Sequence, residues 1–227
     1  MRWLDLLFMH WPVPAEALRP YIPPGLELDT FEGQAWLGVV PFRMAGVRPR
    51  MVPALPGVSA FPELNVRTYV TAGGKPGVWF FSLDAASRPA VEMARAVFHL
   101  NYRHARMAAR TLGDTVHYSS ERTERGAPPA AFAARYRPTG PAFRAAPGSL
   151  ETWLTERYCL YAANRAGQLW RADIHHRPWP LQPAEAEVER NTMTAQIGLA
   201  LPDTRPLLHF ARELEVAAWW PERLGRA

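Results

Sequence analysis

The stretch "ELNVRTYVTAGGKPGVWFFSLDA", residues 63–85, contains two alternating runs that flank the turn "GGKP". Alternation of apolar and polar residues is typical of β-strands, and glycine with proline at the junction favours a tight reversal of the chain. The stretch therefore predicts an antiparallel hairpin. Successive side chains of a strand point to opposite faces, so one face of the first run is polar. Its members are Glu63, Asn65, Arg67 and Tyr69.

The chain before this hairpin also has strand patterns. "LDLLFMHW" in residues 4–11 predicts a strand, and the proline-led residues 14–21 predict a short helix. Two further runs within residues 26–44, "LELDT" and "AWLGVVPFRM", flank the turn "FEGQ" and predict a second hairpin. Residues 47–62 hold several prolines without a sustained period, which indicates a long loop of the kind that often carries function.

The chain after the hairpin alternates strands with two short helices. Helices are predicted at residues 87–98 and 148–157, and a hairpin at residues 158–179. Further strands are predicted at 103–112, 115–123, 130–138, 186–191 and 207–216. Many strands with few helices favour an α+β fold, mainly antiparallel, in the form of a closed or nearly closed barrel. No composition shift marks a boundary, so residues 1–227 are expected to form a single domain.

The composition narrows the class of protein. Hydrophobic residues make up 48% and charged residues 21% of the 227 residues, as in ordinary globular proteins. No stretch approaches the roughly 18 apolar residues of a membrane span, and the N-terminal run carries Asp5, so we expect a core strand there and no membrane partner. Cys159 is the only cysteine, which excludes an internal disulfide and favours a cytoplasmic protein.

The charge distribution argues against a nucleic-acid partner. The formal net charge is +5, but the basic residues are scattered among acidic ones, as in "ERTERG" at residues 121–126. Nucleic-acid binding requires a basic stripe or patch, and none is visible in the sequence. We therefore expect no nucleic-acid partner.

Six blocks of the sequence together resemble one protein family. They are "LLFMHWPV", "PPGLELDTFEGQAWLGVVPF", "FPELNVRTYV", "KPGVWFFSLDA", "GSLETWLTERYCLY" and "IHHRPWPLQPAEAE". Over about residues 1–193 the chain resembles the YqjF-like family of uncharacterised bacterial proteins. That family is similar to the acetoacetate decarboxylase superfamily, which implies a β-barrel or cone with a buried central cavity. The more distant likeness rests on Glu63, the hairpin around Gly77, Asp84 and a helix containing Arg95.

The resemblance also shows what this chain lacks. In the decarboxylase, an arginine opens a motif with a glycine, a proline and two lysines, one of which forms a Schiff base. Placed from Arg95, the two lysine positions fall on Tyr102 and Arg103, neither of which can form an imine. Lys75, the only lysine, lies in the "GGKP" turn. The resemblance therefore implies the fold without lysine-based decarboxylation.

The candidate site follows from the polar strand face and the altered motif. If the polar face lines a cavity, Glu63 is the candidate acid or base, Arg67 binds a carboxylate, and Asn65 and His99 contribute to substrate binding. Only one of the adjacent residues Tyr102 and Arg103 can face inward; an inward tyrosine would stabilise an oxyanion and an inward arginine would bind a carboxylate. A solvated or purely structural role for these groups is the competing interpretation. The catalytic candidates are Glu63 and Tyr102, and the binding candidates are Arg67, Arg103, Asn65 and His99.

A metal or cofactor site is not predicted. His99 and His104 are five residues apart and His175 and His176 are adjacent, so neither pair has the spacing that brings two ligands together. No phosphate-binding loop or dinucleotide fingerprint is present in the sequence. Cys159 is expected to be a buried, inert thiol.

Two classes of function remain. The first is an enzyme that binds a small carboxylate or carbonyl compound in the barrel cavity, with lyase- or hydratase-like acid/base chemistry and no Schiff base. The second is a non-catalytic binding or sensor domain for a hydrophobic small molecule. Convergent Glu63, Arg67 and Tyr102 favour the first, and a dry aromatic lining favours the second. The adjacent Trp219 and Trp220 leave a homo-oligomer contact open beside simple packing.

Overall fold

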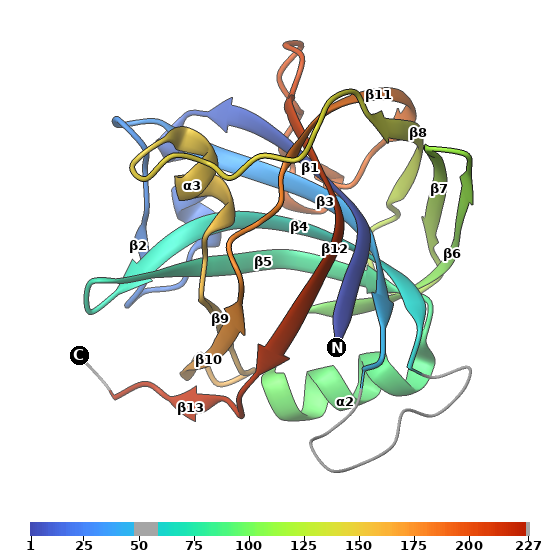
Figure 1. Ribbon diagram of the computed structural model, residues 1–227. Coiled ribbons are helices and arrows are strands. Elements are labelled where there is room, and N and C mark those ends of the chain that lie inside the picture. The colour runs from blue at the N-terminus through green and yellow to red at the C-terminus, as the bar shows by residue number, and fades with distance from the viewer. Residues whose placement is uncertain (48–58, 226–227) are drawn as a thin grey trace.

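Two rings of hydrogen-bonded strands share one wall in the computed structural model, which describes residues 1–47 and 59–225. The shared wall consists of β12 (Leu207–Ala218), β1 (Arg2–Val13), β3 (Ala35–Ala45), β4 (Phe61–Ala72) and β5 (Lys75–Ala85). The larger ring is completed by β6 (Tyr102–Leu112), β7 (Thr115–Arg122), β8 (Ala131–Pro138) and β11 (Gln182–Asn191). The smaller ring is completed by β9 (Cys159–Ala163) and β10 (Leu169–His176). Figure 1 shows the wall strands crossing the molecule.

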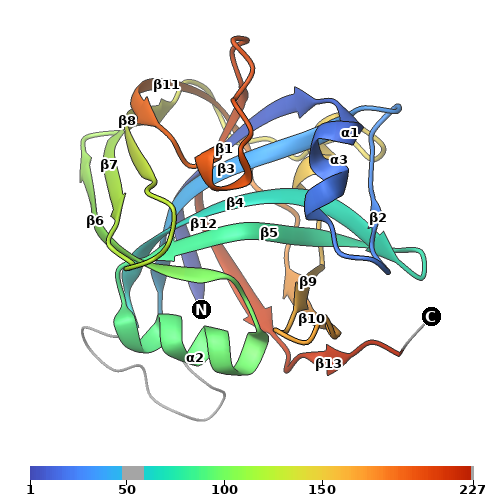
Figure 2. The same cartoon turned by 180° about the vertical axis from the view of Figure 1, so that it is seen from behind.

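The remaining elements are short. Strands β2 (Glu27–Leu28) and β13 (Glu222–Arg223) lie at sheet edges. The helices are α1 (Ala15–Leu18), α2 (Arg88–Phe98) and α3 (Leu150–Thr155), with 3₁₀ turns at Arg19–Tyr21 and Ala195–Ile197. Helix α3 lies above the β4–β5 pair and α2 below it, and the reverse view shows the same arrangement (Figures 1 and 2). Among the described residues, no helix is long and apolar enough to cross a membrane.

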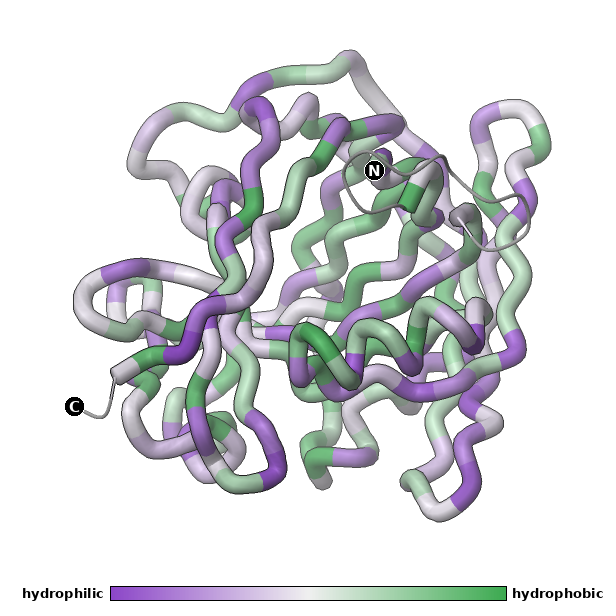
Figure 3. The backbone as a smooth tube through the Cα atoms, turned by 90° about the horizontal axis from the view of Figure 1, so that it is seen from below, coloured by the Kyte–Doolittle hydropathy of each residue, from purple (hydrophilic) through white to green (hydrophobic). Residues whose placement is uncertain are grey.

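Each ring has its own core because the strands of the shared wall alternate between them. Leu64, Val66 and Val70 of β4 pack with Phe132 and Tyr136 of β8 inside the larger ring. The smaller ring encloses a second core that extends to α2, with members such as Phe8, Phe42, Leu83, Val91 and Trp179. Seen from below, the tube of α2 alternates between hydrophobic and hydrophilic residues, as expected for a helix with one buried face (Figure 3). Every wall strand therefore contributes to two separate interiors.

Most of the predicted elements are confirmed. The hairpin of residues 63–85 is the β4–β5 pair, and helical structure lies within all three predicted helix ranges, 14–21, 87–98 and 148–157. The mainly antiparallel α+β fold is also confirmed, with two parallel exceptions, β5 with β6 and β5 with β9.

The predicted hairpin within residues 26–44 is wrong. Strand β2 pairs with β4, because β3 is already hydrogen-bonded to β1 on one edge and to β4 on the other. Glu27 and Leu28 instead extend the outer end of β4, opposite Thr71 and Val70. The central part of the predicted functional loop at residues 47–62 lies outside the described residues.

A buried aspartate fastens the start of β1. Asp5 has a φ of 49° and lies where the β1–β3 register shifts. The residue is 3% exposed. Its carboxylate accepts hydrogen bonds from Arg43, from Thr111 Oγ1 at 3.1 Å and from Arg212 Nη1 at 3.2 Å. The carboxylate thus ties three other strands to β1.

Asp5→Asn is expected to lower the free energy of unfolding by about 2 kcal/mol, because hydrogen bonds to a charged acceptor are each worth roughly 1.5–3 kcal/mol. Asparagine tolerates a positive φ as aspartate does, so the change removes the charge and keeps the backbone. The measurement is urea unfolding at pH 7. Glu213→Gln, which breaks the exposed pair with Arg2, is the control and should cost under about 1 kcal/mol. Equal losses in the two variants would contradict the fastening role.

Candidate functional site

The polar face of β4 is turned into the smaller ring. Glu63, Asn65, Arg67 and Tyr69 are 3%, 5%, 8% and 0% exposed, so all four are buried polar groups and none is a solvated surface residue. The intervening apolar residues fill the larger ring, as the two-residue period of a strand requires. Buried polar side chains are costly unless they find partners inside the protein or in a ligand.

Glu63 forms a hydrogen-bonded pair with Tyr102. The Tyr102 hydroxyl donates to Glu63 Oε2 at 2.8 Å, and the Tyr118 hydroxyl donates to the main-chain oxygen of Glu63 at 2.7 Å. Burial raises the pKa of the Glu63 carboxyl to about 8, and the Tyr102 hydrogen bond offsets only part of this effect. Burial and the neighbouring Glu63 also raise the pKa of Tyr102 well above its ordinary value. Glu63 is therefore mostly protonated at pH 7 and can both donate and accept a proton near neutrality.

Arg67 is a buried cation without an acidic partner among the described residues. Its Nη2 donates to the Tyr69 hydroxyl and to the main-chain oxygen of Leu154, both at the long distance of 3.4 Å. Its guanidinium carbon lies 5.2 Å from the centre of the Phe8 ring. Within residues 1–47 and 59–225, the Nε–H of Arg67 has no hydrogen-bond partner, and neither has the buried Oδ1 of Asn65. Such an arrangement leaves a charge that an anionic ligand would balance.

Two histidines and a glycine complete this polar region. His10 of β1 is fully buried, and its Nε2 lies 2.7 Å from the Tyr69 hydroxyl. A Cβ placed on Gly38 would lie 3.2 Å from both the His10 ring and Arg67 Cγ, so glycine lets these two side chains lie over the β3 backbone. His209 of β12 is 6% exposed on the same face. Burial lowers the pKa of both histidines, and for His10 the nearby Arg67 and His209 lower it further.

Helix α3 covers this part of the wall. Ser149 is its N-cap, and the Ser149 hydroxyl accepts a hydrogen bond from the Thr152 amide. The helix places the Trp153 ring with its centroid 4.8 Å from that of the Tyr69 ring. Arg157 follows the helix, with its Nη1 2.6 Å from Asp29 Oδ2 and its guanidinium carbon 4.8 Å from the Tyr69 ring centre. The helix therefore excludes water from the arginine end of the site.

Four of the six residues predicted for the site, Glu63, Tyr102, Asn65 and Arg67, lie on the interior side of the smaller ring, and Tyr102 is the inward member of the Tyr102–Arg103 pair. Glu63 contacts Tyr102, whereas Arg67 lies four residues further along β4, against Phe8 and Tyr69. Arg103 pairs with Asp84 in the β5–β6 ladder on the other face, where its Nη1 lies 3.9 Å from Glu124.

His99 also lies apart from these residues. It ends α2 with a φ of 54°, and its ring contacts Trp170 with centroids 4.8 Å apart. In the described part of the chain, His99 and Arg103 form no hydrogen bond or ion pair with Glu63 or Arg67.

Sequence reasoning missed His10 and His209. Each interrupts an apolar strand run, "LLFMHW" and "LLHFA", at an inward position. A lone histidine in a core strand is a weak signal by itself, because only the cross-strand register shows that both lie beside the polar face of β4. Cys159 is buried and its thiol pKa is raised by burial, in agreement with an inert thiol. The described residues contain no cluster of three or more metal-ligating side chains.

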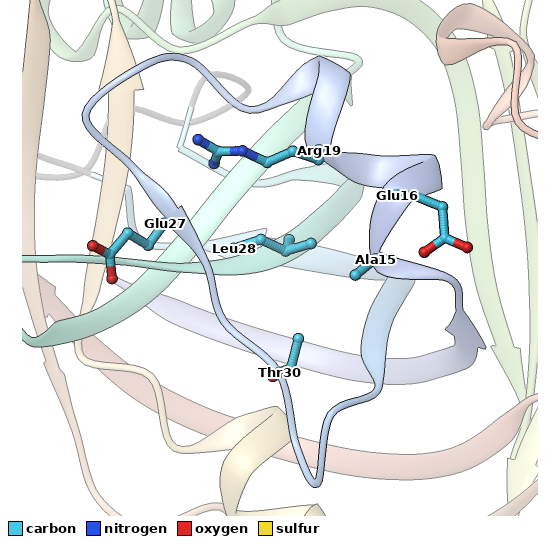
Figure 4. A pocket seen from close by; sticks show the side chains of 6 residues that line it. All are labelled: Ala15, Glu16, Arg19, Glu27, Leu28 and Thr30. Atoms are coloured by element: carbon cyan, nitrogen blue, oxygen red, sulfur yellow. The ribbon is translucent and has the colours of Figure 1, made fainter.

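Surface hollows lie elsewhere. One of about 370 Å³ lies beside α1 and is shown in Figure 4; it is lined by Ala15, Glu16, Arg19, Glu27, Leu28 and Thr30. Its arginine is already engaged, since Arg19 Nη1 donates to the Leu26 oxygen at 2.7 Å. Another hollow, of about 460 Å³, lies on the outer face of β6–β8. Neither includes a residue of the polar face of β4.

Comparisons with known proteins agree with this architecture. The sequence matches the family DUF2071, described as "Uncharacterized conserved protein", over residues 1–215. It is 51% identical over 217 residues to the uncharacterized protein YqjF of Bacillus subtilis, covering 96% of this chain and 88% of the relative.

Among solved structures, acetoacetate decarboxylase from Legionella pneumophila has a TM-score of 0.63 at 14% identity, covering 99% of this chain and 86% of that one. The enduracididine biosynthesis enzyme MppR complexed with pyruvate has a TM-score of 0.67 at 11% identity, covering 99% and 89%. At these identities the likeness establishes the fold.

Proposed function

This chain belongs to the DUF2071 family and has the fold of acetoacetate decarboxylase, and from that premise we propose that it binds a small organic carboxylate inside the smaller ring. Arg67 would hold the carboxylate, and Glu63 would exchange a proton with the bound molecule. The observation that carries the proposal is the buried guanidinium of Arg67, which lacks an acidic partner in the described part of the chain.

The cost of burying Arg67 supports a ligand role. An unpaired charge in a protein interior costs several kcal/mol, and proteins normally place a carboxylate beside it. Here the neighbours are an aromatic ring, a phenol and a main-chain oxygen at 3.4 Å. Guanidinium groups bind carboxylates through two parallel N–H bonds, so the free Nε–H of Arg67 suits a ligand carboxylate.

Glu63 and Tyr102 supply the proton-transfer part of the proposal. A carboxyl with a pKa of about 8 is matched to acid/base work near neutrality, and the Tyr102 hydroxyl at 2.8 Å orients it. A lysine Schiff base is not part of the mechanism: Lys75, the only lysine of the sequence, lies 2.8 Å from both carboxylate oxygens of Asp173 at the end of the β4–β5 hairpin. The reaction class is a lyase- or hydratase-like step without a covalent intermediate.

The structural neighbours support a small ligand of this kind. MppR, which shares the fold at 11% identity, is described in complex with pyruvate, a small carboxylate. The competing function, binding of a hydrophobic molecule, would not require a buried arginine without an acidic partner on the same strand face as a raised-pKa glutamate. It becomes an outcome of the experiment.

The test is a binding screen by thermal shift and calorimetry against short carboxylates, oxo acids, hydroxy acids and apolar compounds. Arg67→Met is expected to weaken carboxylate binding about 10- to 150-fold, the equivalent of a lost charge-assisted hydrogen bond. The ligand-free variant should be as stable as the parent or more so, because the change removes a buried unpaired charge. Arg106→Met is the control, since Arg106 pairs with Glu121 on the outer surface. Stabilisation by apolar compounds alone, unaffected by Arg67→Met, would replace this proposal with the hydrophobic-ligand function.

A further inference from the structure

His10 lies buried next to Arg67, and only one of its two ring nitrogens has a hydrogen-bond partner among the described residues. Its Nε2 lies 2.7 Å from the Tyr69 hydroxyl oxygen, and Arg67 Nη2 donates to that same oxygen at 3.4 Å. Its Nδ1 is buried and has no partner among the described residues. The other edge of the ring, Cδ2 and Nε2, lies over Gly38 beside the aliphatic part of Arg67.

The chain of hydrogen bonds determines which nitrogen of His10 carries the proton. A guanidinium can only donate, so the Tyr69 oxygen accepts from Arg67 and the phenolic hydrogen must go elsewhere. His10 Nε2, at 2.7 Å, is the acceptor available to it. The opposite tautomer would place two N–H donors on one phenolic oxygen and leave the phenolic hydrogen without an acceptor. This arrangement assigns the ring proton to Nδ1, and the Nδ1–H then has no acceptor among the described residues.

The surroundings keep this ring uncharged. His10 is fully buried, and both Arg67 and His209 act against a second proton, which lowers its pKa well below the ordinary value. A neutral imidazole N–H in a buried site donates to an uncharged or partly charged oxygen, and it can polarise a carbonyl group. The His10 and Arg67 side chains thus pack side by side over Gly38, and each carries a buried N–H, one neutral and one charged, that has no partner among the described residues.

We propose that His10 Nδ1–H binds a carbonyl oxygen of the same molecule whose carboxylate is held by Arg67, so that the ligand is a small oxo acid. The inference rests on the proposed function, because it takes the carboxylate at Arg67 as given. It adds the ligand class and a specificity-determining residue. Tyr69 acts as a positioning residue: it joins Arg67 to His10 and fixes the direction of the His10 donor.

The binding test compares three acids of one chain length: pentanoate, 2-oxopentanoate and 4-oxopentanoate. At least one oxo acid should bind about 10-fold more tightly than pentanoate, since one good hydrogen bond contributes on the order of 1 kcal/mol or more. Arg67→Met should weaken all the acids that bind. If the parent protein binds none of them, the proposed function fails. If it binds all three equally, the proposed function stands and the role of His10 is overturned.

Two substitutions separate the two nitrogens of His10. The amide of glutamine reaches as far from Cβ as Nε2 and can still accept from Tyr69, whereas the amide of asparagine reaches as far as Nδ1 and can replace its donor. His10→Gln should remove the preference for the oxo acid, and His10→Asn should retain part of it. The same substitution at an exposed histidine of β10, His175→Gln, is the control. A preference that survives His10→Gln undiminished would overturn the proposal.

The tautomer can be measured without any ligand. Nitrogen-15 NMR of the imidazole rings separates Nδ1–H from Nε2–H forms, and His10 is assigned by its loss in His10→Gln. In the parent protein we expect a neutral ring protonated at Nδ1 from pH 6 to 8. In Tyr69→Phe we expect the Nε2–H tautomer, or exchange between the two tautomers. An Nε2–H ring in the parent protein would overturn the proposal whatever the binding data show.

Discussion

Glu63→Gln is expected to slow exchange of the protons next to the carbonyl of a bound oxo acid by about 10²- to 10⁴-fold, the usual contribution of a positioned general base. Glutamine keeps the shape and can still accept from Tyr102, but it cannot take up a proton. The measurement is loss of the proton NMR signal of the acid in deuterated water. Glu121→Gln on the outer surface is the control, and an equal rate in Glu63→Gln would exclude a role for the carboxyl.

The pH dependence of this exchange follows from the pKa of Glu63, which burial raises to about 8. A base must be ionised, so the rate should rise with pH and level off above about 8.

The free energy of unfolding should change in the opposite direction and fall as the pH rises. Between the ordinary pKa of 4.5 and the folded value of about 8, the unfolded chain loses a proton that the folded chain keeps. The parent protein should therefore lose stability relative to Glu63→Gln as pH rises through that window, by about 1.4 kcal/mol per pH unit at most. Parallel curves for the two proteins would contradict the raised pKa.

Arg122→Met is expected to lower the free energy of unfolding by about 3–5 kcal/mol, the cost of leaving one member of a buried ion pair unpaired. Arg122 and Asp84 have side chains 1% and 0% exposed, and two hydrogen bonds of 3.0 and 2.6 Å join them. Arg122 also donates to Gln196 Oε1 at 2.8 Å and to the Pro128 oxygen at 3.1 Å. Burial already raises the pKa of Asp84 and Arg122 opposes that shift, so the variant leaves a carboxylate that ionises only at high cost. Urea unfolding at pH 7 measures the loss.

The double variant Asp84→Leu, Arg122→Met separates the charge from the packing. With both partners replaced by apolar side chains, most of the lost stability should return. Arg135→Met, which breaks an exposed pair with Glu187, is the control. It should lower the free energy of unfolding by under about 1 kcal/mol. If the double variant is no more stable than the single one, the loss comes from packing and not from an unpaired carboxylate.

Local patterns in the sequence were enough to predict the strands and the polar face. The alternation of Glu63, Asn65 and Arg67 is a property of one strand, and it led directly to three of the four predicted residues that lie buried inside the smaller ring. The Tyr102–Arg103 alternative needed the register of β6 against β5, which no local pattern contains.

Other features depend on contacts between distant segments. Strand β2 pairs with β4 because both edges of β3 are occupied, and the Asp84–Arg122 pair joins β5 to β7 across the larger ring. His10 becomes a neighbour of Arg67, and His209 a neighbour of His10, only when β1 pairs with both β12 and β3. Sequence spacing cannot predict such contacts, because they arise from the order of strands in the sheet.

The shared wall also has a consequence for synthesis of the chain. Strand β12, at residues 207–218, pairs with β1 and lies in both rings, yet it is translated after every other strand of either ring. Neither ring can close until it has left the ribosome. The growing polypeptide therefore carries two unfinished hydrophobic interiors at once, held by pairings of high sequence separation that form slowly. Exposed hydrophobic surface and unpaired strand edges are the features that make partly folded chains prone to aggregation, and this architecture keeps both exposed until β12 is in place.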